Sequence, residues 1–253
     1  MSDTPVRRVK RGWMNLRVDR IVEDTHDTKT FYFVDAEEGG RPFDYIAGQY
    51  LTFRFDSVAE KPVVRSYTMS SSNCEADYSA VTVKRVEGGL ISNWLCDEVK
   101  QDSVLRARGP IGKFVYDAKI DRPTLLMVAG GSGVTPFVSI LREYKEKLGQ
   151  PGCPEKMALL VAYRSKQDLI CWDVLEPLMQ GGDAAVITTL TREKAEGFWN
   201  GRPSVEMLEK AFTEYGSDVT IMTCGPEALM ETAIVYANSA GIAEDQIKTE
   251  SFA

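Results

Sequence analysis

Residues 124–252 alternate short apolar runs with stretches of helical periodicity, and this alternation restricts what the second half of the chain can fold into. The apolar runs of strand length are Thr124–Ala129, Ala158–Tyr163, Ala185–Leu190, Val219–Thr223 and Gln246–Phe252. The segments between them predict helices over Thr135–Leu148, Asp168–Met179, Val205–Phe212 and Glu227–Ala240. Strands that alternate with helices form a parallel sheet covered on both faces. The second half is therefore predicted to be a parallel α/β sheet.

The first half of the chain has a different pattern, with short runs rich in Val, Phe, Tyr and Thr and with Gly, Pro, Asn and Asp between them. The predicted strands are Trp13–Val22, Thr30–Val34, Gln49–Phe55, Val63–Met69, Ala80–Val86 and Ser103–Arg108. One helical stretch, Leu90–Val99, interrupts them. Regularly spaced strands favour an antiparallel β-barrel. The pattern changes near the Asp-Arg-Pro sequence at 121–123, so we expect domains at residues 1–118 and 119–253.

Composition excludes several classes of protein. The net charge of −7 argues against nucleic acid or an anionic membrane as the main partner. No apolar run approaches the length of a membrane span. The single histidine, His26, lies in a polar segment, so no metal site is predicted. The cysteines form no CxxC pair or iron–sulfur run and fit reduced thiols of a cytoplasmic protein. They are Cys74, Cys96, Cys153, Cys171 and Cys224.

Two glycine-containing turns follow predicted strands of the second half. The segment Gly130-Gly131-Ser132-Gly133-Val134-Thr135-Pro136 joins the strand Thr124–Ala129 to a helix. Glycines there allow backbone N–H groups to approach a pyrophosphate, and the helix N-terminus adds partial positive charge. The segment Cys224-Gly225-Pro226 follows the strand Val219–Thr223, again at a carboxyl end, where ligands of parallel sheets bind. The alternative for the first segment is a tight turn without a ligand, and the alternative for Cys224 is a buried, inert cysteine at the end of a strand.

Two segments of the first half also suit a nucleotide. Arg65-Ser66-Tyr67-Thr68 puts a guanidinium and an aromatic ring on one face of a strand, with Thr68 on the opposite face unless the strand ends there. Gly88-Gly89-Leu90 opens a predicted helix that contains Ser92. The free N–H groups at the start of this helix, together with Ser92, could hold a second pyrophosphate. A surface strand and ordinary helix capping are the alternatives. One anion site in each half is harder to explain by turns alone.

Taken in order, these motifs resemble the ferredoxin–NADP⁺ reductase family, which includes cytochrome b5 reductases and oxygenase reductase components. The resemblance runs from about Trp13 to Ala253 and implies a Greek-key β-barrel that binds FAD and a Rossmann-like sheet that binds NAD(P). For FAD and its surroundings it implies Arg65, Ser66, Tyr67, Thr68, Lys84, Gly88, Gly89, Leu90, Ser92, Thr135 and Phe252. For NAD(P) it implies Gly130, Gly131, Gly133, Thr135, Pro136, Arg164, Thr191, Arg192, Arg202, Cys224, Gly225 and Pro226.

The resemblance also assigns three catalytic residues. Thr68 is expected at the reactive edge of the flavin ring, Cys224 beside the nicotinamide with Thr135, and Glu250 in proton traffic. Glu250 could equally form a salt bridge or belong to a loose tail. Whether Phe252 stacks on the flavin or points elsewhere is left open.

The ends of the middle strands bear on which nucleotide is used. Arg164 and Ser165 follow one strand, with no acidic residue before Asp168, and Thr191-Arg192 follow the next. With Arg202, these residues could hold a 2′-phosphate through charge-assisted bonds, which favours NADPH. Solvated surface arginines in an NADH enzyme are the alternative.

The function implied is hydride transfer from NAD(P)H to FAD and then release of single electrons. The chain lacks a cysteine cluster, so a separate carrier such as ferredoxin or flavodoxin is expected to take them. The alternatives are an NADH-dependent reductase of an oxygenase or b5-reductase-like system, a diaphorase or flavin reductase without a protein partner, and a non-catalytic regulator.

Overall fold

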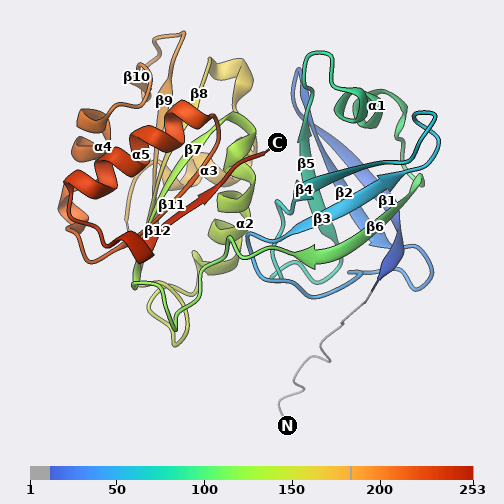
Figure 1. The fold of residues 1–253 in the computed structure, drawn as a ribbon, viewed down its shortest axis with the longest axis horizontal. Helices are drawn as coiled ribbons and strands as arrows, with labels where there is room; N and C mark the ends of the chain where they lie inside the picture. The colour runs from blue at the N-terminus through green and yellow to red at the C-terminus, as the bar shows by residue number, and fades with distance from the viewer. Residues whose placement is uncertain (1–11, 183, 253) are drawn as a thin grey trace.

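The computed structural model describes residues 12–182 and 184–252, which form two units lying side by side (Figure 1). Each unit is built on a six-stranded sheet, the first antiparallel and the second parallel. The predicted fold class is thereby confirmed. Among the residues described, no helix has both the length and the apolar character needed to cross a membrane.

The first unit is a barrel-like sheet with the strand order β4-β3-β6-β1-β2-β5. Its core is made of side chains at alternate positions, because successive residues of a strand point to opposite faces. Phe31, Phe33, Leu51 and Phe53, for example, are almost fully buried. The strands are β1 (Trp13–Thr25), β2 (Thr28–Asp35), β3 (Tyr50–Phe55), β4 (Val63–Thr68), β5 (Ser79–Lys84) and β6 (Val104–Ile111).

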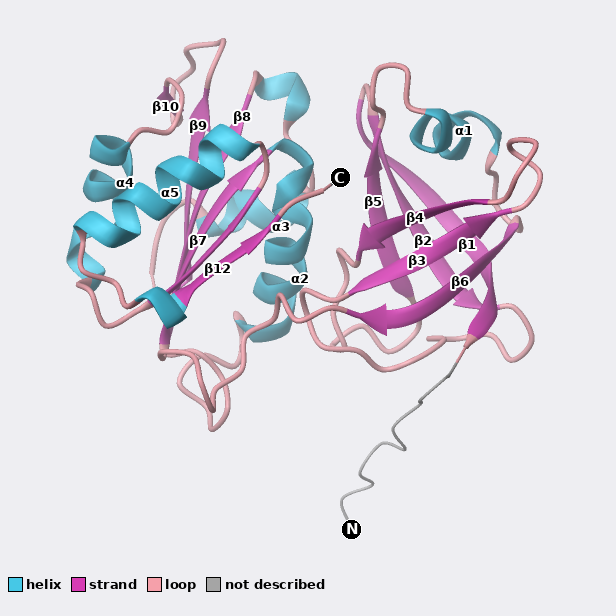
Figure 2. Ribbon diagram, viewed as in Figure 1, coloured by secondary structure: helices cyan, strands magenta, loops and turns pink. Residues whose placement is uncertain are grey.

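The barrel is incompletely closed between its two edge strands, β4 and β5. An isolated bridge between Met69 and Val81 brings the edges together at one end. Helix α1 (Leu90–Glu98) covers the barrel near this opening (Figure 2). It buries Ile91 and Leu95 in the barrel core, and its Trp94 contacts Phe55 with ring centroids 5.6 Å apart. The opening between β4 and β5 therefore lies beside a helix N-terminus.

The second unit is a parallel sheet with the order β10-β9-β8-β7-β11-β12. Helices α2 (Thr135–Tyr144) and α3 (Trp172–Leu175) pack on one face, and α4 (Val205–Phe212) and α5 (Glu227–Ser239) pack on the other. A central strand buried on both faces must be apolar throughout, as the second-half sequence predicts. The strands are β7 (Thr124–Gly130), β8 (Lys156–Tyr163), β9 (Ala184–Leu190), β10 (Trp199–Asn200), β11 (Thr220–Cys224) and β12 (Ile247–Glu250).

The predicted helix over Asp168–Met179 was wrong as a single element. The segment forms a 3₁₀ turn over Lys166–Asp168, the four-residue α3 and a second 3₁₀ turn over Glu176–Leu178. Cys171 adopts a left-handed conformation with φ of 53°, which breaks the helix before α3. Pro177 has no N–H to continue it.

Other parts of the second unit also differ from prediction. The helix predicted to reach Leu148 ends at Tyr144, and the chain then turns through Gly149, whose φ is 72°. Strand β10 was not predicted, since a two-residue strand carries no periodicity. The final strand ends at Glu250, two residues before Phe252.

Helix α2 joins the two units. Its Phe137 meets Phe114 of the connecting segment with ring centroids 5.8 Å apart. Two residues further along α2, Ser139 Oγ donates to the carbonyl oxygen of Ser71 at 2.5 Å. Arg142 Nη1 then lies 3.0 Å from Glu75 Oε1 of the barrel. Apolar and polar contacts along one helix therefore fix the barrel against the parallel sheet.

A buried ion pair ties the segment between the sheets to the last strand. Lys248 Nζ lies 2.6 Å from Asp121 Oδ2 and donates to the carbonyl oxygen of Val115 at 2.9 Å. The Asp121 side chain is 1% exposed, and its Oδ2 also accepts from the Asp117 N–H at 2.7 Å. The carboxylate thus holds together the chain before β7 and strand β12.

We expect Asp121→Ala to lower the melting temperature by about 6 °C or more, because it leaves a largely buried ammonium without its carboxylate, at a cost of about 3 kcal/mol. The control is Asp218→Ala, which removes an ion pair with Arg122 in which the Asp218 side chain is 82% exposed. That exposed pair should contribute less than about 1 kcal/mol. Equal shifts in the two variants, measured by thermal unfolding, would contradict the assignment.

Candidate active site

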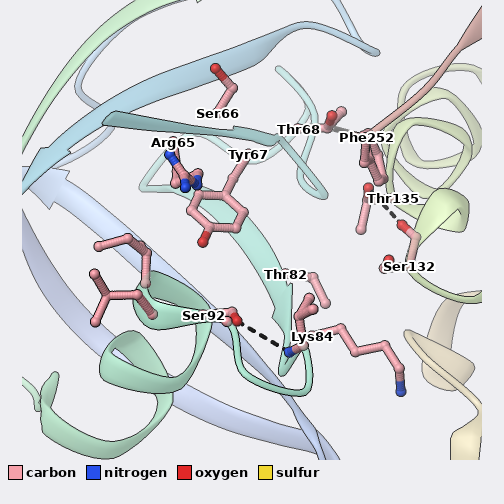
Figure 3. A pocket seen from close by; sticks show the side chains of 14 residues that line it. Arg65, Ser66, Tyr67, Thr68, Thr82, Lys84, Ser92, Ser132, Thr135 and Phe252 are labelled. Carbon is pink, nitrogen blue, oxygen red and sulfur yellow. Dashed lines mark hydrogen bonds between the residues drawn. The ribbon is translucent and has the colours of Figure 1, made fainter. Parts of the chain in front are cut away.

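A cavity of about 400 Å³ lies where the barrel opens toward the parallel sheet (Figure 3). The barrel contributes residues from both edge strands and from the start of α1. The α/β unit contributes the loop after β7, the first residue of α2 and the chain terminus. The lining residues are Arg65, Ser66, Tyr67, Thr68, Thr82, Lys84, Val86, Gly89, Leu90, Ile91, Ser92, Ser132, Thr135 and Phe252. Neither unit could form this cavity alone.

Strand β4 supplies a cation and an aromatic ring to the cavity. Arg65 is exposed and donates to the carbonyl oxygen of Val64 at 2.7 Å. It forms no salt bridge within the part of the chain that the structure describes. Tyr67 packs against Phe53, with ring centroids 6.0 Å apart. Burial raises the pKa of Tyr67 to about 12, so its hydroxyl remains protonated at neutral pH. An unpaired guanidinium beside an aromatic face suits a phosphate attached to a planar ring.

The neighbours of Tyr67 on β4 differ in orientation. Ser66 points away from Tyr67 (Figure 3), and its Oγ lies 3.0 Å from Thr52 Oγ1 on the outer side of the barrel. Thr68 is buried and also lines the cavity, since the strand ends at this residue. The structure therefore brings Arg65, Tyr67 and Thr68 together and directs the Ser66 hydroxyl elsewhere.

Helix α1 presents its N-terminus to the cavity. Gly89 precedes the helix, and no side chain caps it, so the first N–H groups have no intrahelical partner. Ser92 Oγ accepts from the Val86 N–H at 3.1 Å and stabilises the loop before the helix. A Cβ on Gly89 would lie 2.6 Å from this hydroxyl and would displace it from its bond to the Val86 N–H. Gly88, with φ of 69°, does not line the cavity.

Lys84 lines the cavity, but its ammonium is already paired. Lys84 Nζ lies 2.5 Å and 2.6 Å from the two carboxylate oxygens of Asp27. A role for Lys84 in holding a phosphate would require this pair to break. Thr82, two residues earlier on β5, lines the same cavity and was not predicted. The period of two along the strand was the available signal, because it puts both side chains on one face.

The two glycine-containing loops of the α/β unit are in direct backbone contact. A Cβ on Gly133 would lie 2.3 Å from the carbonyl oxygen of Cys224, and one on Gly225 would lie 2.9 Å from the Gly130 nitrogen. Pro226 packs against Gly130, and its Cδ would lie 2.9 Å from a Cβ added there. These glycines are required for the loops after β7 and β11 to pack together at the carboxyl ends of the strands.

Gly131 differs from the other glycines of the loop. It has φ of 55° with open space around its missing Cβ, so it serves the turn itself. Thr135 follows at the start of α2 with its Oγ1 donating to the carbonyl oxygen of Ser132 at 3.1 Å. Pro136 is the second residue of α2, where its missing N–H costs no hydrogen bond.

The predicted arginines follow three adjacent strands at the same edge of the sheet. Arg164 comes after β8 and Arg192 after β9, and the Arg192 N–H donates to the Arg164 carbonyl oxygen at 2.9 Å. The Thr191 N–H likewise donates to the Tyr163 carbonyl oxygen at 2.9 Å. Arg202 follows β10. All three arginines are exposed, and none forms a salt bridge with any described residue. Three free guanidiniums can therefore meet an anion beyond this edge.

Cys224 and Glu250 lie opposite each other in the register of β11 and β12. Neither residue lines the cavity. Cys224 is fully buried, and burial, with a contribution from Glu250, raises the pKa of its thiol well above the ordinary value. Burial also raises the pKa of Glu250 to about 7, and its Oε2 is buried without a hydrogen-bond partner. A protonated thiol thus neighbours a carboxyl that changes charge near neutral pH.

The C-terminal aromatic residue enters the cavity. Phe252 lies between Thr68 and Thr135 in Figure 3 and is 46% exposed. It therefore occupies the space between the barrel strand and the first residue of α2, where the two halves of the site meet.

His26 lies in the exposed turn between β1 and β2, where the barrel meets the second unit. Its Nδ1 is 3.3 Å from the carbonyl oxygen of Gln167. With Asp27 and Asp168 it offers metal-type ligand atoms within 4.8 Å of one another. Asp27 is engaged by Lys84, and Asp168 caps the 3₁₀ turn through Ser165. Both carboxylates therefore already have partners.

The residues of the cavity fit FAD. They combine an aromatic face, an unpaired guanidinium and an uncapped helix N-terminus, which suit the flavin ring and the pyrophosphate. The loops after β7 and β11, beyond the carboxyl ends of the strands, are where nucleotides bind in parallel sheets. Together these features define a flavin- and nicotinamide-binding oxidoreductase.

The comparisons with known proteins agree with this class. Residues 15–116 match the oxidoreductase FAD-binding domain, and residues 127–234 match the oxidoreductase NAD-binding domain. The chain belongs to the ferredoxin–NADP⁺ reductase family. Among solved structures, a ferredoxin NADP⁺ reductase from Neisseria gonorrhoeae has a TM-score of 0.78 at 19% identity, covering 96% of this chain and 99% of that one.

Two curated relatives are reductase components. The ferredoxin reductase component of 3-ketosteroid-9-alpha-monooxygenase from Rhodococcus rhodochrous is 33% identical over 94% of this chain and 64% of its own length. The glycine betaine monooxygenase reductase subunit of Pseudomonas aeruginosa is 30% identical over 86% of this chain and 59% of its own. This chain thus spans less than two thirds of the length of either relative.

The raised pKa of Glu250 predicts how stability depends on pH. Between about pH 4.5 and 7 the folded protein keeps a proton that the unfolded chain has lost, so this residue makes stability fall as pH rises. Glu250→Gln removes the effect. We expect the melting temperature of the variant, relative to the parent, to rise by about 2 °C or more between about pH 5 and pH 8. The exposed Glu231→Gln should show no such trend, and a pH-independent difference for Glu250→Gln would contradict the assignment.

Proposed function

We propose that the protein is a flavoprotein reductase that takes hydride from NADPH, in preference to NADH, and delivers electrons singly to a separate carrier such as ferredoxin or flavodoxin. The observation that carries this proposal is the cavity shared by the two units. Arg65, Tyr67 and Thr68 enter it from the barrel, and Thr135 and Phe252 enter it from the α/β unit. Such an arrangement suits two cofactors that must meet.

FAD, when bound, accepts a hydride from the nicotinamide and releases its two electrons one at a time. Arg65 and the N-terminus of α1 would hold the pyrophosphate of FAD, and Tyr67 would cover one face of its ring. Thr68 would place its hydroxyl at the edge of the ring. The protein's contribution is to bring the two reacting rings together in the correct orientation.

The α/β unit would position the nicotinamide. Thr135 and the buried Cys224 thiol would shape its pocket, and the loop at Gly130–Gly133 would receive the pyrophosphate. Glu250 would hold or release a proton near neutral pH, because its pKa is raised to about 7. Phe252 would have to move for a nicotinamide to reach the space beside Thr68.

The names of the relatives favour a second candidate. Both reductase components belong to monooxygenases, so the carrier or acceptor of this protein could be part of an oxygenase system that uses NADH.

We place the boundary between the two units near residue 118, within the connecting segment. We also place the protein in the cytoplasm, because its cysteines are all free thiols, as expected in a reducing compartment.

The central test is anaerobic stopped-flow reduction of the purified protein. The flavin absorbance band should bleach on mixing with NADPH, and more slowly with NADH. Faster bleaching by NADH would keep the reductase and support the oxygenase alternative. A colourless preparation that fails to bind added FAD would overturn the proposal.

Arg192→Ala tests the choice of nucleotide. Loss of one charge-assisted contact to the 2′-phosphate should lower kcat/KM for NADPH about ten-fold and leave that for NADH unchanged. The matched control is Arg122→Ala, an arginine before β7 at the opposite end of the sheet, which should change neither value. The preference for NADPH is rejected if Arg192→Ala leaves the ratio of the two values as it was.

A further inference from the structure

A series of hydrogen-bonded oxygen atoms leads away from the cofactor cavity on the side of β5. Thr82 lines the cavity (Figure 3), and its Oγ1 lies 2.7 Å from Thr30 Oγ1 on the neighbouring strand β2. Thr30 Oγ1 is in turn hydrogen-bonded to a carboxylate oxygen of Asp24 on β1. Thr82 Oγ1 also donates to Ser70 Oγ at 2.8 Å. We call these four residues the polar chain.

Strand pairing brings the polar chain together. Thr30 pairs directly with Thr82 across β2 and β5, so their side chains share one face of the barrel. The register of β1 against β2 shifts between Glu23 and Thr25, which leaves Asp24 as the extra residue of a β-bulge. Bulges redirect side chains and are frequent beside functional sites, and at this one the carboxyl group of Asp24 meets the Thr30 hydroxyl.

The far end of the polar chain opens into a second cavity of about 50 Å³, between the barrel and the second unit. Asp24, Thr30 and Ser70 line this second cavity, whereas Thr82 lines the cofactor cavity. Asp173 also lines the second cavity, and its side chain is 73% exposed, so the second cavity reaches solvent. Its size and polar lining allow it to hold water. The polar chain therefore connects the cofactor cavity to water on its other side.

The hydroxyl groups of the polar chain are shielded from solvent. Thr30 and Thr82 are each 5% exposed, and Ser70 is 4% exposed. Valine is close to threonine in shape and would occupy the two strand positions without burying a hydroxyl group that needs a partner. Packing alone therefore does not require threonine on both strands.

The surroundings of Asp24 suit a group that takes up a proton and gives it back. Burial raises the pKa of Asp24, as does Asp173, while Thr30 and Arg142 lower it. The carboxylate thus accepts a proton more readily than an exposed one does. The other titratable groups that line the second cavity have pKa values raised by burial, so they stay protonated at neutral pH. They are Tyr32 of β2, Tyr78 before β5 and Cys171 before α3.

The hydrogen bonds of the polar chain can run in two directions, because a hydroxyl hydrogen rotates to suit its acceptor. With Asp24 ionised, Thr82 can donate to Thr30, and Thr30 donates to the carboxylate. With Asp24 protonated, the carboxyl group donates to Thr30, and Thr30 donates to Thr82. Thr82 then donates to Ser70, which is the direction that the structure has for this bond. Ser70 thus supplies the acceptor that the second direction requires.

We propose that Thr82, Thr30 and Asp24 form a proton relay from the cofactor cavity to the second cavity. This inference rests on the proposed function, in which one NAD(P)H and two oxidised carriers give one NAD(P)⁺, one proton and two reduced carriers. That proton is set free in the cofactor cavity. Thr82 accepts it and passes its own hydroxyl proton to Thr30, which passes its proton to the Asp24 carboxylate. Water in the second cavity takes the proton from Asp24, and the hydroxyl groups rotate back.

This relay is distinct from the role expected of Glu250. The buried Oε2 of Glu250 has no hydrogen-bond partner within residues 12–182 and 184–252, and Glu250 does not line the cofactor cavity. The polar chain, in contrast, is already connected to that cavity through Thr82. Variants of the polar chain therefore separate the two routes.

The test compares five variants of the full protein loaded with FAD. Thr30→Val interrupts the polar chain, and Thr30→Ser keeps a hydroxyl group at the same position. Asp24→Asn removes the terminal carboxyl group, and its control is Asp173→Asn, which changes a carboxyl group of the second cavity outside the polar chain. Thr52→Val is the control for loss of a buried hydroxyl group, because Thr52 is 7% exposed and bonds to Ser66 on the outer side of the barrel.

Proton release and electron transfer are measured in one anaerobic stopped-flow experiment. Protein reduced by one equivalent of NAD(P)H is mixed with ferricyanide in weakly buffered solution that contains a pH-indicator dye. Two ferricyanide ions take up the two electrons of each reduced flavin, and one proton is released. Recovery of the flavin band follows the electrons, and the dye follows the proton. Infrared spectra of the oxidised, resting protein follow protonation of Asp24 as the pH is lowered.

We expect the proton to appear together with flavin recovery in the parent. Thr30→Val and Asp24→Asn should slow proton release about ten-fold or more, because a positioned proton-transfer group contributes at least that much. Thr30→Ser and the two controls should stay within about three-fold of the parent. The infrared band of the protonated carboxyl group should disappear in Asp24→Asn, shift in Thr30→Val and persist in Asp173→Asn.

Three results would overturn the relay while the parent is still bleached by NAD(P)H. One is proton release that keeps its parent rate in both Thr30→Val and Asp24→Asn. Another is equal slowing in Thr30→Val and Thr52→Val. The third is slowing in Thr30→Val that Thr30→Ser does not reverse, and this pair decides if Asp24→Asn fails to fold. A parent that binds FAD but is not bleached would instead reject the proposed function.

Discussion

The site depends on the packing of α2 against the barrel, because its residues come from both units. Thr135 begins α2 and faces the cavity, while Ser139 and Arg142 bind the barrel one and two turns later. Residues at these spacings lie on one side of a helix, and the helix is a stiff element. The contacts at Ser71 and Glu75 therefore fix how far Thr135 stands from Thr68.

The contact between the units combines apolar and charged groups that serve different purposes. The Phe114–Phe137 pair buries apolar surface, which favours association without specifying one orientation. The ion pairs of Arg142 do specify an orientation, because its guanidinium lies 3.0 Å from Glu75 of the barrel and 3.5 Å from Asp173 of α3. The Arg142 and Glu75 side chains are largely buried, at 21% and 17% exposed, and burial also raises the pKa of nearby Asp24. In such surroundings a displaced charge is costly, so the ion pairs select one placement of the units.

Much of this arrangement was accessible from the sequence where local patterns decide structure. The continuous apolar run of β7 and the glycines after it predicted a parallel sheet with a nucleotide loop, and both motifs of the barrel predicted their part of the cavity. Residues that act through distant partners were not predictable. Ser139 and Arg142 resemble ordinary helix residues in the sequence. The pairing of Lys84 with Asp27 could not be predicted either, because the two residues are 57 positions apart.

The breaks in regular structure were missed for a related reason. Residues 166–178 have the composition of a helix, but the left-handed conformation of Cys171, together with Pro177, prevents a single one. A non-glycine residue adopts that conformation when tertiary contacts favour it. Cys171 is buried against the barrel, where its Sγ lies 3.7 Å from Thr82 Oγ1. The local geometry of the second unit is thus set in part by the first, which no pattern within either unit could reveal.

The incomplete closure of the barrel explains why the cavity lies where it does. Edge strands expose backbone hydrogen-bonding groups, and most proteins pair or cover them. Here β4 and β5 meet at the Met69–Val81 bridge, and both then contribute to the cavity wall. A ligand in this cavity would bind only the folded protein, since its contacts come from strands far apart in sequence. Such binding stabilises the fold in proportion to the logarithm of ligand concentration over Kd. The opening is therefore a weakness of the isolated barrel that cofactor binding compensates, which couples the stability of this unit to its function.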